Sequence, residues 1–262
     1  MARADLHQHD LTPAAAEALV AGAGVKPTEH VLDLGAGTGA ITAACLAAGA
    51  KVSAIEIDPQ RATGLRQRFA TELADGSLVL QVGDARHHLP LLPARWRMVA
   101  NPPFMHTAVL LRRFLIEDLP VARPHRIDLV LQRQAAGKLV GSRGGYTRSS
   151  VMCHLAGKPA RGEDLARNAV TPPSHVPLCT FSWQARRSAP EANEIARVDR
   201  LLERAFAGPK DVRSALRGVA TPAILKRQGA EQGWNPDAHP RFVPPLAWLT
   251  LSRFLAQIGK LT

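Results

Sequence analysis

The chain contains few cysteine and aromatic residues and no long apolar runs. Only three of its 262 residues are cysteine, and they lack the Cys-x-x-Cys spacing of a disulfide framework or a zinc site. One tyrosine and four tryptophans are too few for a wide platform that stacks single-stranded nucleic acid. No apolar run spans a bilayer, and residues 1–13 lack the apolar segment of a secretory signal. We therefore expect a cytoplasmic protein that needs neither a membrane nor a metal.

Charge divides the chain into two halves. Residues 1–120 carry 11 basic and 12 acidic side chains, whereas residues 121–262 carry 22 basic and 10 acidic side chains. A cationic surface attracts polyanions, and guanidinium groups bind phosphates through paired hydrogen bonds. The pattern favours a nucleic-acid partner, although arginine-rich genomes also produce basic surfaces.

Apolar runs alternate with helical patterns along most of the chain. Strands are expected near residues 30–34, 52–57, 78–82, 97–101, 127–132 and 176–183, and helices over 11–25, 41–48, 107–115 and 133–140. This alternation predicts a parallel sheet covered by helices. Short helices between prolines follow residue 187, so we expect a catalytic domain over 1–186 and a small helical domain over 187–262.

A glycine-rich turn follows the first predicted strand of the sheet. Gly35, Gly37 and Gly39 allow the backbone to approach a ligand, and Glu56 ends the next strand about twenty residues later, where a carboxylate can accept ribose hydroxyls. Asp84, after a further strand, is placed to reach an adenine amino group. The glycine spacing favours S-adenosylmethionine over a dinucleotide. Singly, Glu56 could be a solvated strand end and Asp84 a turn or helix cap.

The most informative motif is Asn101-Pro102-Pro103-Phe104, directly after an apolar strand. Proline has no backbone N–H and restricts the preceding residue to extended conformations, so Asn101 is presented in a nearly fixed direction. An amide, a carbonyl and an aromatic face together can hold a planar amino group. In isolation the same residues are also an ordinary turn.

Taken in order, these blocks resemble the ribosomal RNA adenine-N6 methyltransferases, and the Erm-type macrolide-resistance enzymes that modify 23S RNA in particular. The matching blocks are Gln8-His9-Asp10-Leu11, Leu32 to Gly39, Ile55-Glu56-Ile57-Asp58, Gly83-Asp84-Ala85, Ala100 to Phe104 and Leu131 to Gln134. Pro172 to Val176 and Leu201 to Arg217 extend the resemblance. Two positions depart from the family pattern, because Asp10 replaces a usual aromatic residue and Pro102 a usual aliphatic one.

The resemblance implies a Rossmann-like α/β methyltransferase fold, with a mostly parallel seven-stranded sheet and a small C-terminal helical domain that binds RNA. It implies S-adenosyl-L-methionine as cofactor, ribosomal RNA as partner, a monomer, and antibiotic resistance as the consequence of methylation. The implied catalytic residues are Asn101, Pro102 and Phe104. The implied cofactor-binding residues are Gln8, His9, Leu11, Gly35, Gly37, Gly39, Glu56, Ile57, Asp84, Ala85 and Asn101.

Two other functions fit the same residues. The chain could methylate another amino group, such as guanine N2, a protein glutamine or a small amine, since the Asn-Pro-Pro-aromatic motif occurs in enzymes of each kind. It could also be a non-catalytic RNA-binding module with a vestigial cofactor pocket, although an intact set of Glu56, Asp84 and Asn101 argues against this.

Overall fold

A computed structural model describes residues 9–85, 87, 89–102, 107–116, 123–208 and 210–261. Its strands are β1 Asp10–Leu11, β2 His30–Leu34, β3 Lys51–Glu56, β4 Leu78–Val82, β5 Arg97–Ala100, β6 Arg126–Gln132, β7 Gly157–Asp164, β8 Val170–Thr171 and β9 Leu178–Ala185. Its helices are α1 Pro13–Ala23, α2 Ala40–Ala47, α3 Pro59–Arg68, α4 Ala70–Ala74, α5 Thr107–Ile116, α6 Arg133–Val140, α7 Arg148–Ala156, α8 Ala192–Ala205, α9 Val212–Ala215, α10 Pro222–Gln232 and α11 Pro245–Gln257, with short 3₁₀ helices at Arg167–Ala169 and Pro240–Phe242.

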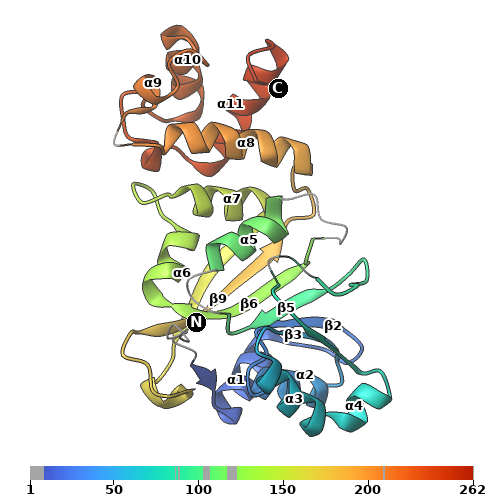
Figure 1. The fold of residues 1–262 in the computed structure, drawn as a ribbon. Helices are drawn as coiled ribbons and strands as arrows, with labels where there is room; N and C mark the ends of the chain where they lie inside the picture. The colour runs from blue at the N-terminus through green and yellow to red at the C-terminus, as the bar shows by residue number, and fades with distance from the viewer. Residues whose placement is uncertain are drawn as a thin grey trace. The chain divides into compact units, whose positions relative to one another are not determined.

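Seven strands form one mixed sheet in the order β4-β3-β2-β5-β6-β9-β7 (Figure 1). The strands from β4 to β6 run parallel, and β9 pairs antiparallel with β6. The expected fold class, a mostly parallel seven-stranded sheet with C-terminal helices, is confirmed. Because β3, β2 and β5 are parallel neighbours, their carboxyl ends meet at one edge of the sheet.

The first helix begins where its sequence predicts. Thr12 caps α1 by accepting a hydrogen bond from the Ala15 N–H, and Pro13 occupies the first turn. Helices α1, α2 and α3 lie around β2 and β3 (Figure 1), and the alanine-rich faces of α1 and α2 and Leu65 of α3 are buried together with Val31, Val52 and Leu78. The glycine turn between β2 and α2 is held to the sheet, because the N–H groups of Gly35 and Ala36 donate to the Ile55 carbonyl oxygen at 2.9 and 3.0 Å.

The strand β7 is not apparent in the sequence. Six of its eight residues are exposed, so it shows no apolar alternation. It stands at the end of the strand order beside β9, and an added Cβ at Gly162 would collide with the Thr180 hydroxyl. Backbone pairing and close approach, which leave little trace in side-chain pattern, account for this strand.

A two-stranded sheet fixes the amino-terminal arm. The strand β1 pairs antiparallel with β8, so Asp10 lies opposite Thr171 and Leu11 opposite Val170. The His9 ring hydrogen-bonds with the Pro172 carbonyl oxygen at 2.7 Å. Residues 170–172, near the expected proline-rich entry to the last strand, thus hold residues 9–11 in place.

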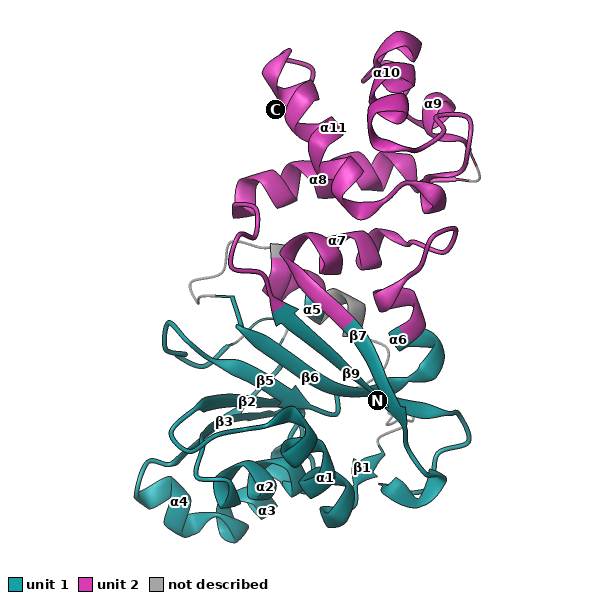
Figure 2. Cartoon of the chain, turned by 180° about the vertical axis from the view of Figure 1, so that it is seen from behind, with its two compact units in different colours: residues 1–111, 119–136, 160–184 teal, residues 112–118, 137–159, 185–262 magenta. Residues whose placement is uncertain are grey.

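Contacts divide the chain into two compact units (Figure 2). Unit 1 comprises residues 1–111, 119–136 and 160–184, and unit 2 comprises 112–118, 137–159 and 185–262. Within unit 2, α7, α8 and α11 pack on one another, and Trp248 of α11 is fully buried. Unit 2 therefore includes segments that lie before residue 187 as well as the expected helical region.

No helix in the described part of the chain is both long and apolar enough to cross a membrane.

Candidate active site

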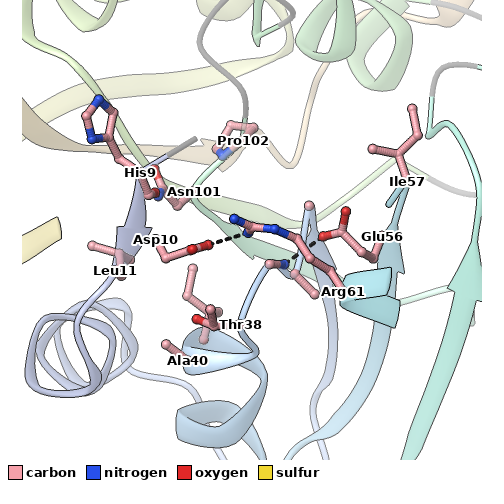
Figure 3. A pocket seen from close by; sticks show the side chains of 14 residues that line it. His9, Asp10, Leu11, Thr38, Ala40, Glu56, Ile57, Arg61, Asn101 and Pro102 are labelled. Atoms are coloured by element: carbon pink, nitrogen blue, oxygen red, sulfur yellow. Dashed lines mark hydrogen bonds and ion pairs between the residues drawn. The ribbon is translucent and has the colours of Figure 1, made fainter. Parts of the chain in front are cut away.

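The carboxyl ends of β2, β3 and β5 border an open cavity within unit 1 (Figure 3). The cavity is lined by His9, Asp10, Leu11, Gly35, Ala36, Gly37, Thr38, Ala40, Ile41, Glu56, Ile57, Arg61, Asn101 and Pro102. Most of the residues expected from the sequence therefore meet here, although they come from four separate segments.

The glycines of the turn have different surroundings. Gly35 and Gly37 line the cavity with φ angles of 77° and 57°, a backbone region that side chains disfavour. Gly39 caps α2, and an added Cβ there would lie 2.7 Å from Leu65 and 2.6 Å from Phe69. Gly39 therefore allows close helix packing and is not among the lining residues.

Glu56 is buried at the end of β3 with its carboxylate at the cavity. Its two oxygens accept hydrogen bonds from the Gly37 N–H at 2.7 Å and the Asp58 N–H at 2.9 Å. Each carboxylate oxygen has a second lone pair, so Glu56 retains acceptors for two ribose hydroxyls. The N–H groups also fix the carboxylate in one orientation.

The strand β4 ends beside Glu56. The Gly83 N–H donates to the Glu56 carbonyl oxygen at 2.9 Å, and the half-buried Asp84 and Ala85 follow. These two residues are not among those that line the cavity. Gln8, Pro103 and Phe104 lie outside the described residues.

Asn101 follows β5 and presents a free acceptor. Its side-chain nitrogen donates to the His9 carbonyl oxygen at 2.6 Å. Its side-chain oxygen is buried and accepts no hydrogen bond from the described residues. A buried acceptor without a donor is costly, and its occurrence in a cavity indicates a place for a ligand donor.

A second carboxyl group is buried in β2. Asp33 accepts a hydrogen bond from the Thr42 hydroxyl at 2.6 Å. Burial and the nearby negative charge of Glu56 raise the pKa of Asp33 to about 7, against the opposing effect of the Thr42 hydrogen bond. Asp33 fixes the first turn of α2 to the strand that leads into the glycine turn.

Sequence reasoning gave no cofactor role to Asp10 and did not identify Arg61. Their side chains form an ion pair at 2.7 Å that crosses the cavity (Figure 3). Burial acts to lower the pKa of Arg61, but the hydrogen bond with Asp10 and the charges of Glu56 and Asp58 raise it overall. The sequence feature that could have identified Arg61 is its position in the first turn of the helix that follows β3.

Within the described ranges, no group of three or more His, Cys, Asp or Glu side chains is arranged to hold a metal ion.

The fold and the cavity define an S-adenosyl-L-methionine-dependent methyltransferase. Residues 7–208 match the family described as ribosomal RNA adenine dimethylase, and the chain belongs to this family. The expected family is thereby confirmed. The cofactor is S-adenosyl-L-methionine, and the free acceptors of Glu56, the open glycine backbone and the net negative charge of the lining residues fit it.

Curated relatives agree on the family. Ribosomal RNA small subunit methyltransferase A of Synechococcus sp. strain CC9605 is 32% identical over 256 residues, which covers 90% of this chain and 89% of that protein. The protein of the same name from Prochlorococcus marinus strain MIT 9303 is 32% identical over 267 residues, with 97% and 94% coverage.

Two solved structures share the fold across nearly the whole chain. The 23S rRNA methyltransferase ErmE has a TM-score of 0.75 at 22% identity, covering 95% of this chain and 100% of that one. A dimethyladenosine transferase from Plasmodium falciparum also has a TM-score of 0.75, at 19% identity, with 97% and 99% coverage. Both therefore share the fold of this chain.

Proposed function

We propose that this protein methylates the exocyclic N6 amino group of an adenine in ribosomal RNA. The observation that carries the proposal is the buried side-chain oxygen of Asn101, which has no donor among the described residues and belongs to a residue that lines the cofactor cavity. An adenine amino group offers two N–H donors. Asn101 accepts one of them, and the neighbouring Pro102 carbonyl accepts the other.

The two acceptors make the target nitrogen a better nucleophile. The lone pair of an exocyclic adenine nitrogen is delocalised into the ring, so the nitrogen is a poor nucleophile. Hydrogen bonds from both N–H groups to Asn101 and Pro102 favour a more pyramidal nitrogen. The bound cofactor supplies an electrophilic methyl group, and catalysis comes mainly from alignment and electrostatic preorganisation.

The His9 carbonyl determines which end of the Asn101 amide faces the substrate. Because the Asn101 nitrogen donates to that carbonyl at 2.6 Å, the oxygen is left for the target N–H. After methylation the nitrogen is acidic and loses its proton readily, so a dedicated histidine base is unnecessary. Phe104, by its place in the motif, stacks on the adenine after it leaves its helix.

The proposed target is 23S ribosomal RNA, with macrolide-type resistance as the consequence. The order of sequence blocks, which resembles Erm-type enzymes, supports this target. A small-subunit RNA is the second candidate, because the curated relatives carry the name small subunit methyltransferase A. Either RNA suits the excess of 12 positive charges in residues 121–262 and would be met in the cytoplasm.

Labelled methyl groups can distinguish these targets. The protein is incubated with tritiated S-adenosylmethionine and one substrate at a time. The substrates are purified 16S RNA, purified 23S RNA, the assembled small subunit and the assembled large subunit. Label on adenine N6 in 23S RNA supports the proposal, and label on adenine in 16S RNA selects the second candidate. Label on guanine, on a protein or on a small amine refutes adenine as the substrate. The Asn101→Ala variant serves as the inactive control.

A further inference from the structure

Asp10 and Arg61 occupy the space that the glycine turn leaves open. An added Cβ at Gly37 would collide with the Asp10 carboxylate and lie 3.0 Å from the Arg61 guanidinium. A glycine turn at a cofactor site serves to let the ligand approach the backbone. Here two charged side chains from different segments already lie against it.

The pair is only partly exposed, with 28% of the Arg61 side chain and 23% of the Asp10 side chain accessible. Removing one charge at such a place leaves the other without its partner, which is costly. A ligand that separates the two groups must therefore offer an opposite charge to each of them. A ligand without charged groups cannot do so.

The amino-acid end of S-adenosylmethionine has this property. It carries an α-ammonium and an α-carboxylate group on one carbon atom, so its opposite charges lie close together, as do those of Asp10 and Arg61. The lining residues Asp10, Glu56 and Arg61 together carry a formal charge of −1. The cofactor carries +1 through its sulfonium group, so its charge complements that of the cavity.

We propose that Asp10 and Arg61 bind the amino-acid end of the cofactor, with the Asp10 carboxylate receiving the α-ammonium group and the Arg61 guanidinium receiving the α-carboxylate group. Their mutual ion pair in the ligand-free protein is exchanged for two ion pairs with the ligand. This rests on the assignment of the cavity as the cofactor site. It gives a function to Asp10, the position at which the chain departs from the family's aromatic residue.

Binding of two related ligands tests the proposal by calorimetry. S-adenosylhomocysteine has the zwitterionic end, whereas 5′-methylthioadenosine shares the nucleoside and thioether but lacks it. For Asp10→Asn and Arg61→Gln we expect affinity for S-adenosylhomocysteine to fall about tenfold or more, since each loses a charge-assisted hydrogen bond, and affinity for methylthioadenosine to change less than about twofold. Asp10→Glu should keep most of the wild-type preference for S-adenosylhomocysteine over methylthioadenosine. Arg66→Gln, an exposed change on the same helix α3, is the matched control.

A third ligand separates the two roles. Decarboxylated S-adenosylmethionine retains the ammonium group but lacks the carboxylate, so its affinity should fall in Asp10→Asn and stay unchanged in Arg61→Gln. Equal losses for all ligands would show that the ion pair only maintains the protein structure, and no loss for any ligand would also overturn the proposal. If Glu56→Ala leaves both nucleoside ligands bound as in the wild type, the assignment of the cavity fails instead. Circular dichroism confirms that each variant is folded.

Discussion

The side-chain nitrogen of Asn101 donates a hydrogen bond to the carbonyl oxygen of His9, across 92 positions in the sequence. The residue at the end of β5 is thus oriented by the arm that precedes β1. That arm is itself held by the pairing of β1 with β8. The orientation of the proposed acceptor therefore depends on three segments that are distant in sequence.

Replacing Asn101 tests this arrangement. Asn101→Ala removes the acceptor for the target N–H, and we expect the rate of methyl transfer to fall by about 10²–10³-fold or more, as when a preorganised polar group of an active site is removed. Affinity for S-adenosylhomocysteine should be only modestly weaker. Single-turnover transfer of labelled methyl and calorimetry measure the two effects separately. Full activity in this variant would refute the proposed role of Asn101.

The buried guanidinium of Arg97 joins β5 to its neighbours. It donates to the Asp128 carboxylate at 2.8 Å, to the Glu29 carboxylate at 2.9 Å and to the Ala23 carbonyl at 2.7 Å, and only 2% of its side chain is accessible. Arg97→Met leaves Asp128 with Arg126 as its remaining guanidinium partner, at 2.8 Å, but removes the donor to the Ala23 carbonyl, so we expect the free energy of unfolding to fall by about 1–3 kcal/mol. Chemical denaturation measures the change.

An exposed ion pair provides the control for Arg97. Arg213 contacts Asp237 at 2.8 Å with 40% of its side chain accessible. Arg213→Met should lower the free energy of unfolding by less than about 1 kcal/mol, because solvent screens such pairs. Similar losses in the two variants would contradict the structural role assigned to Arg97.

Asp33 should make the folded protein less stable as the pH rises. Its pKa is about 7 in the folded protein and about 4 in an unfolded chain. Since the folded pKa is the higher one, folding is favoured below pH 4, and this contribution is lost as pH rises to 7. Asp33→Asn cannot ionise, so its free energy of unfolding relative to the wild type should increase by about 2–3 kcal/mol between pH 5 and pH 8.

Urea denaturation of both proteins at the two pH values measures this difference. Any difference in hydrogen bonding between the amide and the acid is the same at each pH and cancels in the comparison. Other titrating groups are common to both proteins and cancel as well. A difference that stays constant from pH 5 to pH 8 would mean that Asp33 has no raised pKa.

The positions of the central strands and the residues at their carboxyl ends could be predicted from the sequence, because the central strands are continuous apolar runs. Each such run ends in a recognisable residue: the glycine turn after β2, Glu56 in β3 and Asn101 after β5. In a parallel sheet these ends necessarily meet. The cavity therefore follows from the pattern of local elements.

Contacts between side chains of distant segments could not be predicted. Arg61 is one of several arginines on α3, and only its place in the first turn brings it to Asp10. The exposed strand β7 is held by its backbone and has no apolar pattern to reveal it. Such features depend on tertiary packing, which a single sequence does not display.

The basic residues of unit 2 should control affinity for RNA. Arg204, Lys210 and Arg217 line a shallow depression together with Ser214. Arg204 already donates to the Arg217 carbonyl oxygen at 2.7 Å, whereas Lys210 and Arg217 are exposed. If their charges contact phosphates, Lys210→Gln and Arg217→Gln should each weaken RNA binding and reduce the slope of log affinity against log salt by about one.

Filter binding or fluorescence anisotropy over a series of salt concentrations measures that slope. Lys26→Gln and Arg66→Gln remove exposed charges of the same kinds from unit 1 and serve as matched controls. Because phosphate contacts depend on charge and not on base identity, the two unit 2 variants should lose affinity equally for 16S and 23S RNA. Equal salt slopes in all four variants would show that RNA does not contact the depression, and the cationic character of the second half would then need another cause.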